Sequence, residues 1–478
     1  MITINHFING KYVAPGGGEY LDGFNPAIGE VFTKIANGTA HDVQMAVDAA
    51  KSALPAWKAM PAEDRFRILN AIAEGIETHI DELASAESRD QGKPLWLSKS
   101  EMQRASQNFR FFATAAVQFA SESHQTDTRA INYTLRQPVG IVGCISPWNL
   151  PLYLFTWKIA PALAAGNCVV AKPSEFTPLT AHLIGEIANK AGLPPGVLNV
   201  VHGLGSTCGQ AIVEHPEIKA ISFTGGTATG KHIASVAAPM FKKLSLELGG
   251  KNPNIIFDDA DLTEAVKTSV RSSFLNQGEI CLCGSRVFVH TGVYDAFKSA
   301  LLQEVVKMQV GDPFDDKTRV GAIVSKPHFE KVLSYIDLAR QEGGTILCGG
   351  QEVKPAGFEN GWFIAPTIIE GLSAACRTNT EEIFGPVITL IPFETEEEVL
   401  EMANGTAYGL AATLWTSDLK KAHRMAEALQ SGIVWVNCWL LRDLRTPFGG
   451  VKQSGVGREG GWEAMRFFTE PKNVCIAY

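Results

Sequence analysis

The chain has 478 residues, of which 45% are hydrophobic and 19% are charged, so it is long enough for two or three ordinary globular domains. Its formal net charge of −8 argues against a nucleic-acid or membrane partner, because both require a basic face. The longest uncharged stretch, 137–157, contains three prolines and Asn149, which would break a membrane helix.

The nine cysteines are scattered along the chain, and their number is odd. A secreted disulfide framework would show an even set at short spacings, and no signal peptide opens the sequence. These features predict a reducing, cytoplasmic environment. Cys281 and Cys283 lie one residue apart, but no histidine or third cysteine is near enough to complete a four-ligand site. No metal site is expected.

The first part of the chain predicts short strands and then helices. Residues up to about 26 are rich in glycine and alternate in hydrophobicity, as short strands do. Thr39 and Asp42 have the spacing of a capping box, and the helical spacing of apolar residues continues to about 54. Further helices are predicted from 62 to just before Gly92 and over 97–120. Residues 130–136 alternate like a strand without a neighbouring helix, which predicts an extended arm.

From residue 139 to about 248, short β-rich runs alternate with helical stretches. Helices are expected to begin near residues 151, 178, 206 and 227. This alternation predicts a parallel, doubly wound sheet, which binds ligands where the carboxyl ends of strands meet the amino ends of helices. The expected strands are 139–145, 168–172, 197–202, 220–224 and 243–247.

The second half repeats the alternation with a different rhythm. Strands are expected at 254–257 and 287–290. The last residues, 472–478, alternate apolar side chains to the end. Such a terminal strand pairs with another strand, frays, or leaves an exposed edge. The expected helices begin near 261 or span 292–308, 327–343, 395–404 and 418–430.

Two glycine-rich turns follow predicted strands and open predicted helices. The turn Gly203–Gly209 misses the G-x-G-x-x-G spacing of a dinucleotide-binding turn by one residue. The turn Phe223–Gly230 could present backbone N–H groups and a helix amino end to a pyrophosphate. Taken alone, each fits a tight structural turn better than a nucleotide site.

The stretch Ser273–Cys283 presents a cysteine just past a glycine turn at Gly278. That position suits a nucleophile, because Cys281 is fixed there and remains reachable by a small molecule. A lone cysteine beside a turn is also a common small hydrophobic residue. Three further motifs favour the nucleophile: Phe-Thr-Gly-Gly-Thr at 223–227, Leu-Glu-Leu-Gly-Gly-Lys at 246–251 and Glu-Glu-Ile-Phe-Gly-Pro at 381–386.

With these motifs the chain resembles the aldehyde dehydrogenase superfamily over nearly its whole length. The resemblance implies an α/β fold with a Rossmann-like doubly wound cofactor domain, an α/β catalytic domain and a small β oligomerisation arm of a homodimer or homotetramer. It also implies that the terminal strand pairs across a subunit boundary. The implied bounds are 1–119 and 139–249 for NAD binding, 250–453 for catalysis, and 120–138 with 464–478 for the arm and tail.

The resemblance implies NAD as the cofactor. Lys172-Pro-Ser-Glu175 is similar to the family's adenosine-ribose clamp, where a carboxylate favours the free 2′-hydroxyl of NAD over the 2′-phosphate of NADP. Glu382 and Phe384 match the positions that hold the nicotinamide ribose and ring. The implied cofactor-binding residues are Ile145, Trp148, Lys172, Ser174, Glu175, Gly205, Phe223, Thr224, Gly225, Gly226, Leu248, Glu382 and Phe384.

Oxidation of an aldehyde to an acid requires a nucleophile, oxyanion donors, a hydride acceptor and a base that activates water. By resemblance, Cys281 attacks to form a thiohemiacetal, which loses hydride to leave a thioester. The Asn149 amide and the Cys281 backbone N–H would hold the oxyanion. Glu247 would be the general base, because flanking leucines should raise its pKa. Lys158 and Glu459 resemble partners in a proton relay.

Outside the resemblance, two of these residues have ordinary explanations. Asn149 follows a proline and fits a turn, and Glu247 fits a strand glutamate in a structural ion pair. The family motifs favour the catalytic roles.

The segment 437–450 corresponds to one wall of the family's substrate funnel, and it carries Arg442 and Arg445. The predicted helix 97–120 forms another wall, and its register turns Arg104 toward the funnel. Two converging arginines suit a planar carboxylate, because the guanidinium fork bonds both oxygens. The alternative is that the arginines are solvated or paired with Asp443.

The pattern Trp-Leu-x-Arg-Asp-Leu-Arg-Thr-Pro-Phe-Gly-Gly, with Gly-Glu-Ile-Cys-Leu-Cys, is similar to the family's 2-aminomuconate 6-semialdehyde and 2-hydroxymuconate semialdehyde dehydrogenases. These enzymes oxidise ring-cleavage products of tryptophan (the kynurenine route) and of aromatic compounds, and both substrates carry a carboxylate. The Cys-Leu-Cys run favours the amino substrate. Cys283 is expected to line the pocket and touch substrate, and Glu279, where many relatives have glutamine, is expected to affect only the surface.

Three alternatives stay open. A dehydrogenase for an aliphatic, betaine or retinal-type aldehyde would not need Arg442. A cysteine acyl-hydrolase would act without NAD, and NADH formation would distinguish it from a dehydrogenase. A binding protein that kept only the fold is disfavoured by the intact set of Cys281, Glu247 and Asn149.

Overall fold

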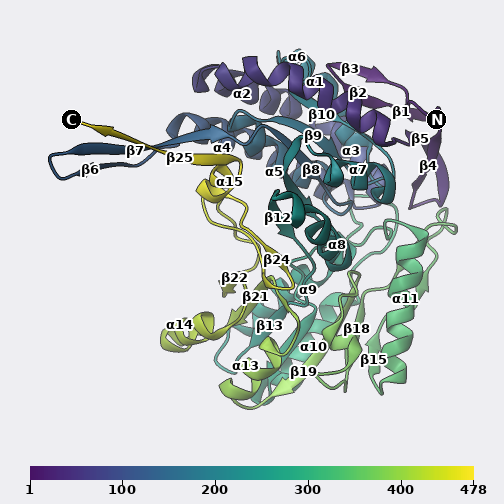
Figure 1. The fold of residues 1–478 in the computed structure, drawn as a ribbon. Helices are drawn as coiled ribbons and strands as arrows, with labels where there is room; N and C mark the ends of the chain where they lie inside the picture. The colour runs from purple at the N-terminus through teal and green to yellow at the C-terminus, as the bar shows by residue number, and fades with distance from the viewer.

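The computed structural model describes residues 1–478 as two large sheets with their helices and a narrow arm that projects to one side (Figure 1). The sheet nearer the N-terminus has eight strands, the other has seven, and the arm is a separate three-stranded sheet. No helix of this structure is both long and apolar enough to cross a membrane.

The eight-stranded sheet has the order β24-β12-β11-β8-β9-β10-β2-β3. Its five central strands are parallel, as predicted, and they are largely apolar because helices cover both faces. Antiparallel strands extend both ends of the sheet, which the sequence did not indicate. The strands are β12 (Lys243–Glu247), β11 (Ile218–Thr224), β8 (Ile141–Ile145), β9 (Cys168–Lys172), β10 (Leu198–Val200), β2 (His6–Ile8), β3 (Lys11–Val13) and β24 (Gly455–Val456).

The helices around this sheet bury one continuous apolar core. The first begins as predicted: the Thr39 N–H donates to Asp42 Oδ2 at 2.8 Å. The prediction of a single helix from residue 62 is wrong. The backbone leaves the helical region at His79, so the segment forms two helices. The helices are α1 (Ala40–Ala59), α2 (Ala62–Thr78), α3 (Ile80–Gln91), α4 (Leu95–Gln118), α5 (Pro151–Ala164), α6 (Leu179–Lys190), α7 (Gln210–Glu214), α8 (Thr227–Ala237) and α15 (Gly461–Phe467).

The seven-stranded sheet has the order β15-β18-β19-β14-β13-β21-β22, and all of its strands except β15 run parallel. Only β13 and β14 were predicted. The strands are β13 (Pro253–Ile256), β14 (Arg286–His290), β15 (Thr345–Cys348), β18 (Thr367–Glu370), β19 (Val387–Phe393), β21 (Ala411–Trp415) and β22 (Ile433–Val436). The helices are α9 (Leu262–Phe274), α10 (Tyr294–Val305), α11 (Lys326–Gln341), α12 (Arg377–Thr380), α13 (Glu396–Asn404) and α14 (Leu419–Ala428).

The arm consists of β6 (Ser123–Thr126), β7 (Ala130–Pro138) and the terminal strand β25 (Thr469–Ala477). β25 pairs antiparallel with β7 of its own chain along its whole length. The tail therefore has a strand partner within its own chain, and pairing across a subunit boundary, for which the other edge of β25 is left free, stays a prediction. Both the hairpin and the C-terminus reach the tip of the arm (Figure 1).

Smaller elements complete the fold. The predicted N-terminal strands include a three-stranded sheet separate from the large ones. The strands are β1 (Ile2–Ile4), β4 (Tyr20–Asn25), β5 (Glu30–Ala36), β16 (Glu352–Val353), β17 (Phe363–Ile364), β20 (Tyr408–Gly409) and β23 (Val451–Lys452). Short non-α turns are η1 (Gly205–Gly209), η2 (Ala238–Met240), η3 (Leu275–Gly278) and η4 (Thr291–Val293).

Candidate active site

Cys281 is presented by a tight turn between α9 and β14. The turn passes through Gly278, whose φ is +72°, and a Cβ there would lie 2.2 Å from the Gly385 carbonyl oxygen, so only glycine fits. Beyond the turn, Asn252 Nδ2 donates to the carbonyl oxygens of Cys281 at 2.7 Å and Cys283 at 2.9 Å. The backbone that carries the thiol is therefore fixed both before and after Cys281.

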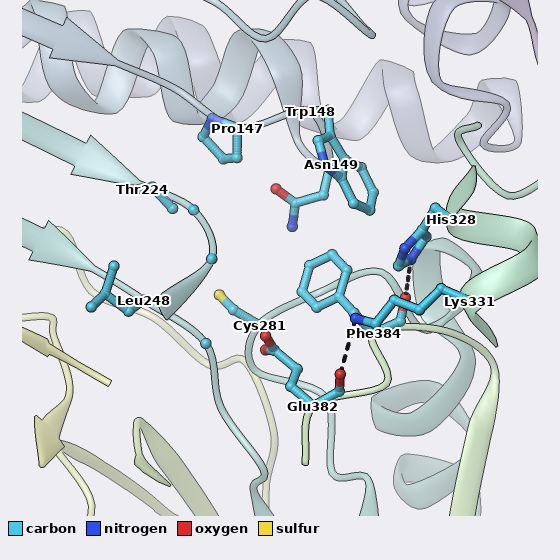
Figure 2. Close-up of a pocket in the computed structure, with 13 residues that line it drawn as sticks. Pro147, Trp148, Asn149, Thr224, Leu248, Cys281, His328, Lys331, Glu382 and Phe384 are labelled. Atoms are coloured by element: carbon cyan, nitrogen blue, oxygen red, sulfur yellow. Dashed lines mark hydrogen bonds between the residues drawn. The ribbon is translucent and has the colours of Figure 1, made fainter. Parts of the chain in front are cut away.

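Cys281 lines three cavities, and two of them carry the other predicted catalytic residues. The first, of about 260 Å³, lies at the carboxyl ends of the central parallel strands (Figure 2). The second lies on the other side of the thiol, toward α4 and the loop after β22. The first is lined by Trp148, Asn149, Thr224, Gly225, Gly226, Leu248, Glu382 and Phe384, and the second by Glu247, Glu459, Arg104 and Arg442.

Asn149 lies in the loop between β8 and α5, with its side-chain amide projecting into the first cavity near Cys281 (Figure 2). Its Nδ2 donates to the Glu279 carbonyl at 2.9 Å. The backbone carbonyl of Asn149 accepts from Lys93 Nζ at 2.9 Å and from Asn276 Nδ2 at 3.0 Å. These bonds fix the residue and leave the second N–H of its side-chain amide for an oxyanion beside the thiol.

Glu247 ends β12 and is almost fully buried, yet neither carboxyl oxygen has a hydrogen-bond partner. Burial and the nearby Glu459 carboxylate raise the pKa of Glu247 well above its usual value, while Lys158 and Arg442 oppose the shift. The pKa of Glu247 is therefore shifted upward, as the sequence predicted. A carboxyl without partners, lining the same cavity as Cys281, is free to exchange a proton with the thiol or with water.

A buried ion pair lies close enough to Glu247 to affect its pKa. Lys158 Nζ lies 2.8 Å from Glu459 Oε1, and Ser222 Oγ lies 3.2 Å from the ammonium and 3.1 Å from the carboxylate. Both charged side chains are buried, and Glu459 lines the second cavity together with Glu247. The three groups form a continuous polar path leading away from the cavity.

The surroundings of Cys281 favour the protonated thiol. Burial raises the pKa of Cys281 above its ordinary value, and the carboxyl groups of Glu247 and Glu382 raise it further, against the opposing effect of Arg442. A nearby base that takes the proton would therefore assist the attack on an aldehyde.

The turn between β11 and α8 fits a phosphate. α8 begins at Thr227, directly after Gly225 and Gly226, and a Cβ on Gly226 would meet no atom within 4 Å. The hydroxyl oxygen of Thr224 is buried without a hydrogen-bond partner. An unpaired polar atom beside the amino end of an eleven-residue helix suits a pyrophosphate.

The remaining predicted cofactor residues lie outside the wall of the first cavity. Lys172 Nζ is 3.2 Å from Glu175 Oε2 at the end of β9, so the two groups of the predicted ribose clamp are in contact. Inside the cavity, Glu382 Oε1 accepts from the Gly250 N–H at 2.8 Å. The residues outside this wall are Ile145, Lys172, Ser174, Glu175, Gly205 and Phe223.

Two arginines line the second cavity and meet at one tyrosine. The Arg104 guanidinium lies 3.9 Å over the Tyr153 ring, and Arg442 Nη1 donates to the Tyr153 oxygen at 2.6 Å. Arg442 also stacks on Phe448, with 4.2 Å between its Cζ and the ring centre. The cavity thus presents two positive groups beside the Cys281 thiol.

The model of the family described as "Aldehyde dehydrogenase family" matches residues 12–474. The chain belongs to the aldehyde dehydrogenase family. It is 49% identical to the 2-aminomuconic semialdehyde dehydrogenase of Mus musculus, over 100% of this chain and 99% of the relative. It is 46% identical to the 2-hydroxymuconic semialdehyde dehydrogenase of Pseudomonas sp. strain CF600, over 100% of both chains.

A solved NAD⁺ complex of an aldehyde dehydrogenase from Bacillus cereus superposes with a TM-score of 0.97 at 39% identity, over 99% of this chain and 96% of that one. The α/β fold implied by the motifs is therefore confirmed.

One sequence-based expectation for this aldehyde dehydrogenase is corrected, and two others are refined. Arg445 is exposed and its Nε donates to Asp443 Oδ1 at 2.9 Å, which is the alternative considered for it, so the arginines that line the cavity are Arg104 and Arg442. Cys283 lines a third, smaller cavity that Cys281 also lines, and its contact with substrate stays a prediction. Glu279 is not at the surface: it is fully buried.

The Glu279 carboxyl is bonded on both oxygens. Oε2 accepts from Gln91 Nε2 at 2.6 Å, and Oε1 accepts from the Val324 N–H at 3.2 Å. Burial raises the pKa of Glu279 well above its usual value. A carboxyl two residues before the nucleophile thus ties the catalytic turn to α3 and to the loop before α11.

Two residues of α11 line the first cavity without having been predicted. The ring of His328 contacts the Phe384 carbonyl at 2.7 Å, and Lys331 Nζ donates to the Glu382 carbonyl at 3.1 Å (Figure 2). Burial lowers the pKa of His328 to about 4, so the ring is neutral. Both brace the loop that carries Glu382 and Phe384. The sequence predicted the helix but offered no motif to mark these positions.

Proposed function

We propose that this protein is an NAD-dependent dehydrogenase that oxidises 2-aminomuconate 6-semialdehyde to 2-aminomuconate. The observation that supports this most directly is the place of Cys281 between two cavities. One cavity begins at a helix amino end suited to a pyrophosphate, and the other offers two arginines to a carboxylate. Relatives named for 2-aminomuconic semialdehyde match the chain over its full length.

In the proposed reaction, Glu247 takes the proton of Cys281 as the sulfur bonds to the aldehyde carbon. The Asn149 Nδ2 and the Cys281 backbone N–H donate to the oxyanion of the thiohemiacetal. NAD, when bound, would supply the acceptor for the hydride of the thiohemiacetal carbon, and Glu247 must pass on the thiol proton before the second half of the reaction. The Glu247 carboxylate then takes a proton from the water that attacks the thioester, and the tetrahedral adduct releases the acid as that proton returns to the sulfur.

The thiol proton collected by Glu247 must leave before the carboxylate can activate water. Glu459 lines the same cavity as Glu247, and Lys158 and Ser222 both bond to Glu459. We assign these groups to proton release, since their polar atoms lie within hydrogen-bond distance of one another.

The proposed cofactor is NAD rather than NADP. Glu175, in contact with Lys172, would accept a hydrogen bond from a ribose 2′-hydroxyl and would repel a 2′-phosphate. Glu382 and Phe384, from the loop braced by α11, would hold the nicotinamide ribose and ring. A solved relative binds NAD⁺ on the same fold.

The proposed substrate class follows from the arginine pair. A carboxylate bound by Arg104 and Arg442 would leave the aldehyde end of a short conjugated chain pointing toward Cys281, because all three line one cavity. The 2-hydroxymuconate semialdehyde has the same carboxylate and is the second candidate, supported by the relative named for it. The substituent beside the carboxylate, amino or hydroxyl, distinguishes the two.

We further propose the division of the chain given by the resemblance, with the arm of β6, β7 and β25 as the oligomerisation unit of a homodimer or homotetramer. The exposed outer edge of β25 in this narrow sheet supports an interface there. All nine cysteines are free thiols, which supports a reducing compartment such as the cytoplasm.

The test is NADH formation by the wild-type protein with the two muconate semialdehydes and an uncharged aldehyde of similar length, each with NAD and with NADP. We expect kcat/KM with NAD to be at least about 100-fold higher for the muconate compounds, roughly 3 kcal/mol. Equal turnover of all aldehydes would contradict the proposed substrate and indicate a general aldehyde dehydrogenase. Ester hydrolysis without any NADH formation would point to the acyl-hydrolase instead.

A further inference from the structure

Tyr153 occupies the point where the two arginines of the second cavity meet. It lies in the first turn of α5 and is almost fully buried. Its carbonyl accepts from Asn108 Nδ2 at 3.1 Å, and its ring stacks on Trp157 with an interplanar angle of 28°. The phenol is therefore set rigidly against the cavity wall by the core of the helix pair α4 and α5.

The two arginines use different parts of the tyrosine. Arg104 lies flat over the ring face, 3.9 Å from its centre, which is a cation–π contact. Arg442 donates from Nη1 to the phenol oxygen at 2.6 Å. The bond from Arg442 is the one hydrogen bond of the phenol oxygen, so the phenol O–H remains able to donate to a ligand.

Neither guanidinium forms an ion pair with a carboxyl group of the chain, although Glu101, Glu247 and Glu459 line the same cavity. The two guanidinium groups converge on one aromatic side chain, and Arg442 bonds to its phenol rather than to a carboxylate. Like charges brought together in a partly buried site repel one another, so a bound carboxylate would stabilise the arrangement. Tyr153 is the shared contact that keeps both groups in place before the anion arrives.

We infer that Tyr153 is a specificity-determining residue that joins Arg104 and Arg442 into one cradle for the substrate carboxylate. The inference rests on the proposed function and deepens it. The phenol oxygen orients Arg442, the ring face seats Arg104, and the phenol O–H adds a third donor to the bound carboxylate.

The test uses Tyr153→Phe, which keeps the ring for Arg104 and removes only the phenol oxygen. The readouts are the KM of the carboxylate-bearing semialdehyde, the KM of an uncharged aldehyde, and competitive inhibition by muconate, a dicarboxylate that lacks the aldehyde. We expect about tenfold weaker binding of both carboxylate ligands, with kcat and the KM of the uncharged aldehyde unchanged. Tyr294→Phe, which loses a hydrogen bond to Glu370 far from the cavity, is the matched control.

A double-mutant cycle with Arg442→Ala shows whether the tyrosine acts through the arginine. In the Arg442→Ala background, Tyr153→Phe should weaken muconate binding by less than about threefold, because most of the lost interaction runs through Arg442. If muconate inhibits the wild type and Arg442→Ala relieves it while Tyr153→Phe does not, the inference about Tyr153 fails and the proposed function stands. If muconate does not inhibit the wild type, the carboxylate cradle itself is refuted.

Discussion

Removal of Lys158 and removal of Glu459, the two members of the buried ion pair near Glu247, should shift the pKa of Glu247 in opposite directions. Lys158 lowers that pKa and Glu459 raises it. Lys158→Met should therefore raise the pKa of Glu247 and move the rise of kcat/KM to more alkaline pH, because the base works only when ionised. Glu459→Gln should lower the pKa and move the same rise to more acidic pH.

The expected sizes follow from the burial of the pair. Both charges act on the pKa of Glu247, and a close charge shifts a carboxyl pKa by about 1–3 units, so each variant should move the profile by about one unit or more. Lys158 and Glu459 are 2.8 Å apart and buried, and removal of one partner strands the other charge, at about 3–5 kcal/mol of stability. The double variant Lys158→Met/Glu459→Gln should recover much of that stability and have a nearly wild-type profile.

The assay is the pH dependence of kcat/KM from initial rates of NADH formation, with unfolding followed in parallel by circular dichroism. Lys51→Met is the control, because Lys51 pairs with Glu217 at 2.8 Å on the exposed surface and such pairs contribute about 0–1 kcal/mol. Shifts of the two profiles in the same direction, or no shift in either, would refute the electrostatic assignment of Glu247 as the base.

Three further predictions concern single side chains. Glu247→Gln should raise the thermal midpoint at alkaline pH and leave it unchanged below about pH 4.3, since the buried carboxyl with its raised pKa loses stability as pH rises above the unfolded value; calorimetry across pH checks the sign. Asn149→Ala should lower kcat about 100- to 1000-fold, measured at unchanged circular dichroism. Glu175→Ala should reduce the preference for NAD over NADP by about tenfold or more, compared as kcat/KM for both.

The sequence predicted the first sheet well and the second poorly, for a physical reason. The five parallel strands of the first sheet are separated by helices with recognisable starts, such as Pro151 and Thr227. Strands such as Val387–Phe393 and Ala411–Trp415 are short apolar runs buried on both faces, and they lack the alternation that marks a half-exposed strand. The antiparallel strands at the sheet ends come from distant parts of the chain, which local patterns do not reveal.

The site shows the same division. The sequence motifs identified three catalytic candidates, Cys281, Asn149 and Glu247. In the structure Asn149 and Glu247 line two cavities that share Cys281. Arg445 sits in the same motif as Arg442, but only the three-dimensional path of the loop shows that it turns outward to Asp443. Tyr153 reads as one more apolar position of α5, and its role depends on two side chains from other segments.

The most direct test of the carboxylate-binding account compares wild type, Arg442→Ala and Arg445→Ala in NADH formation. Arg445→Ala is the matched control, since Arg445 lies three residues away on the same loop and pairs with Asp443 at the surface. We predict that wild type and Arg445→Ala prefer 2-aminomuconate 6-semialdehyde over an uncharged aldehyde by about 100-fold or more in kcat/KM, and that Arg442→Ala loses this preference. Equal turnover of both aldehydes by the wild type, or a preference that survives Arg442→Ala, would contradict the account.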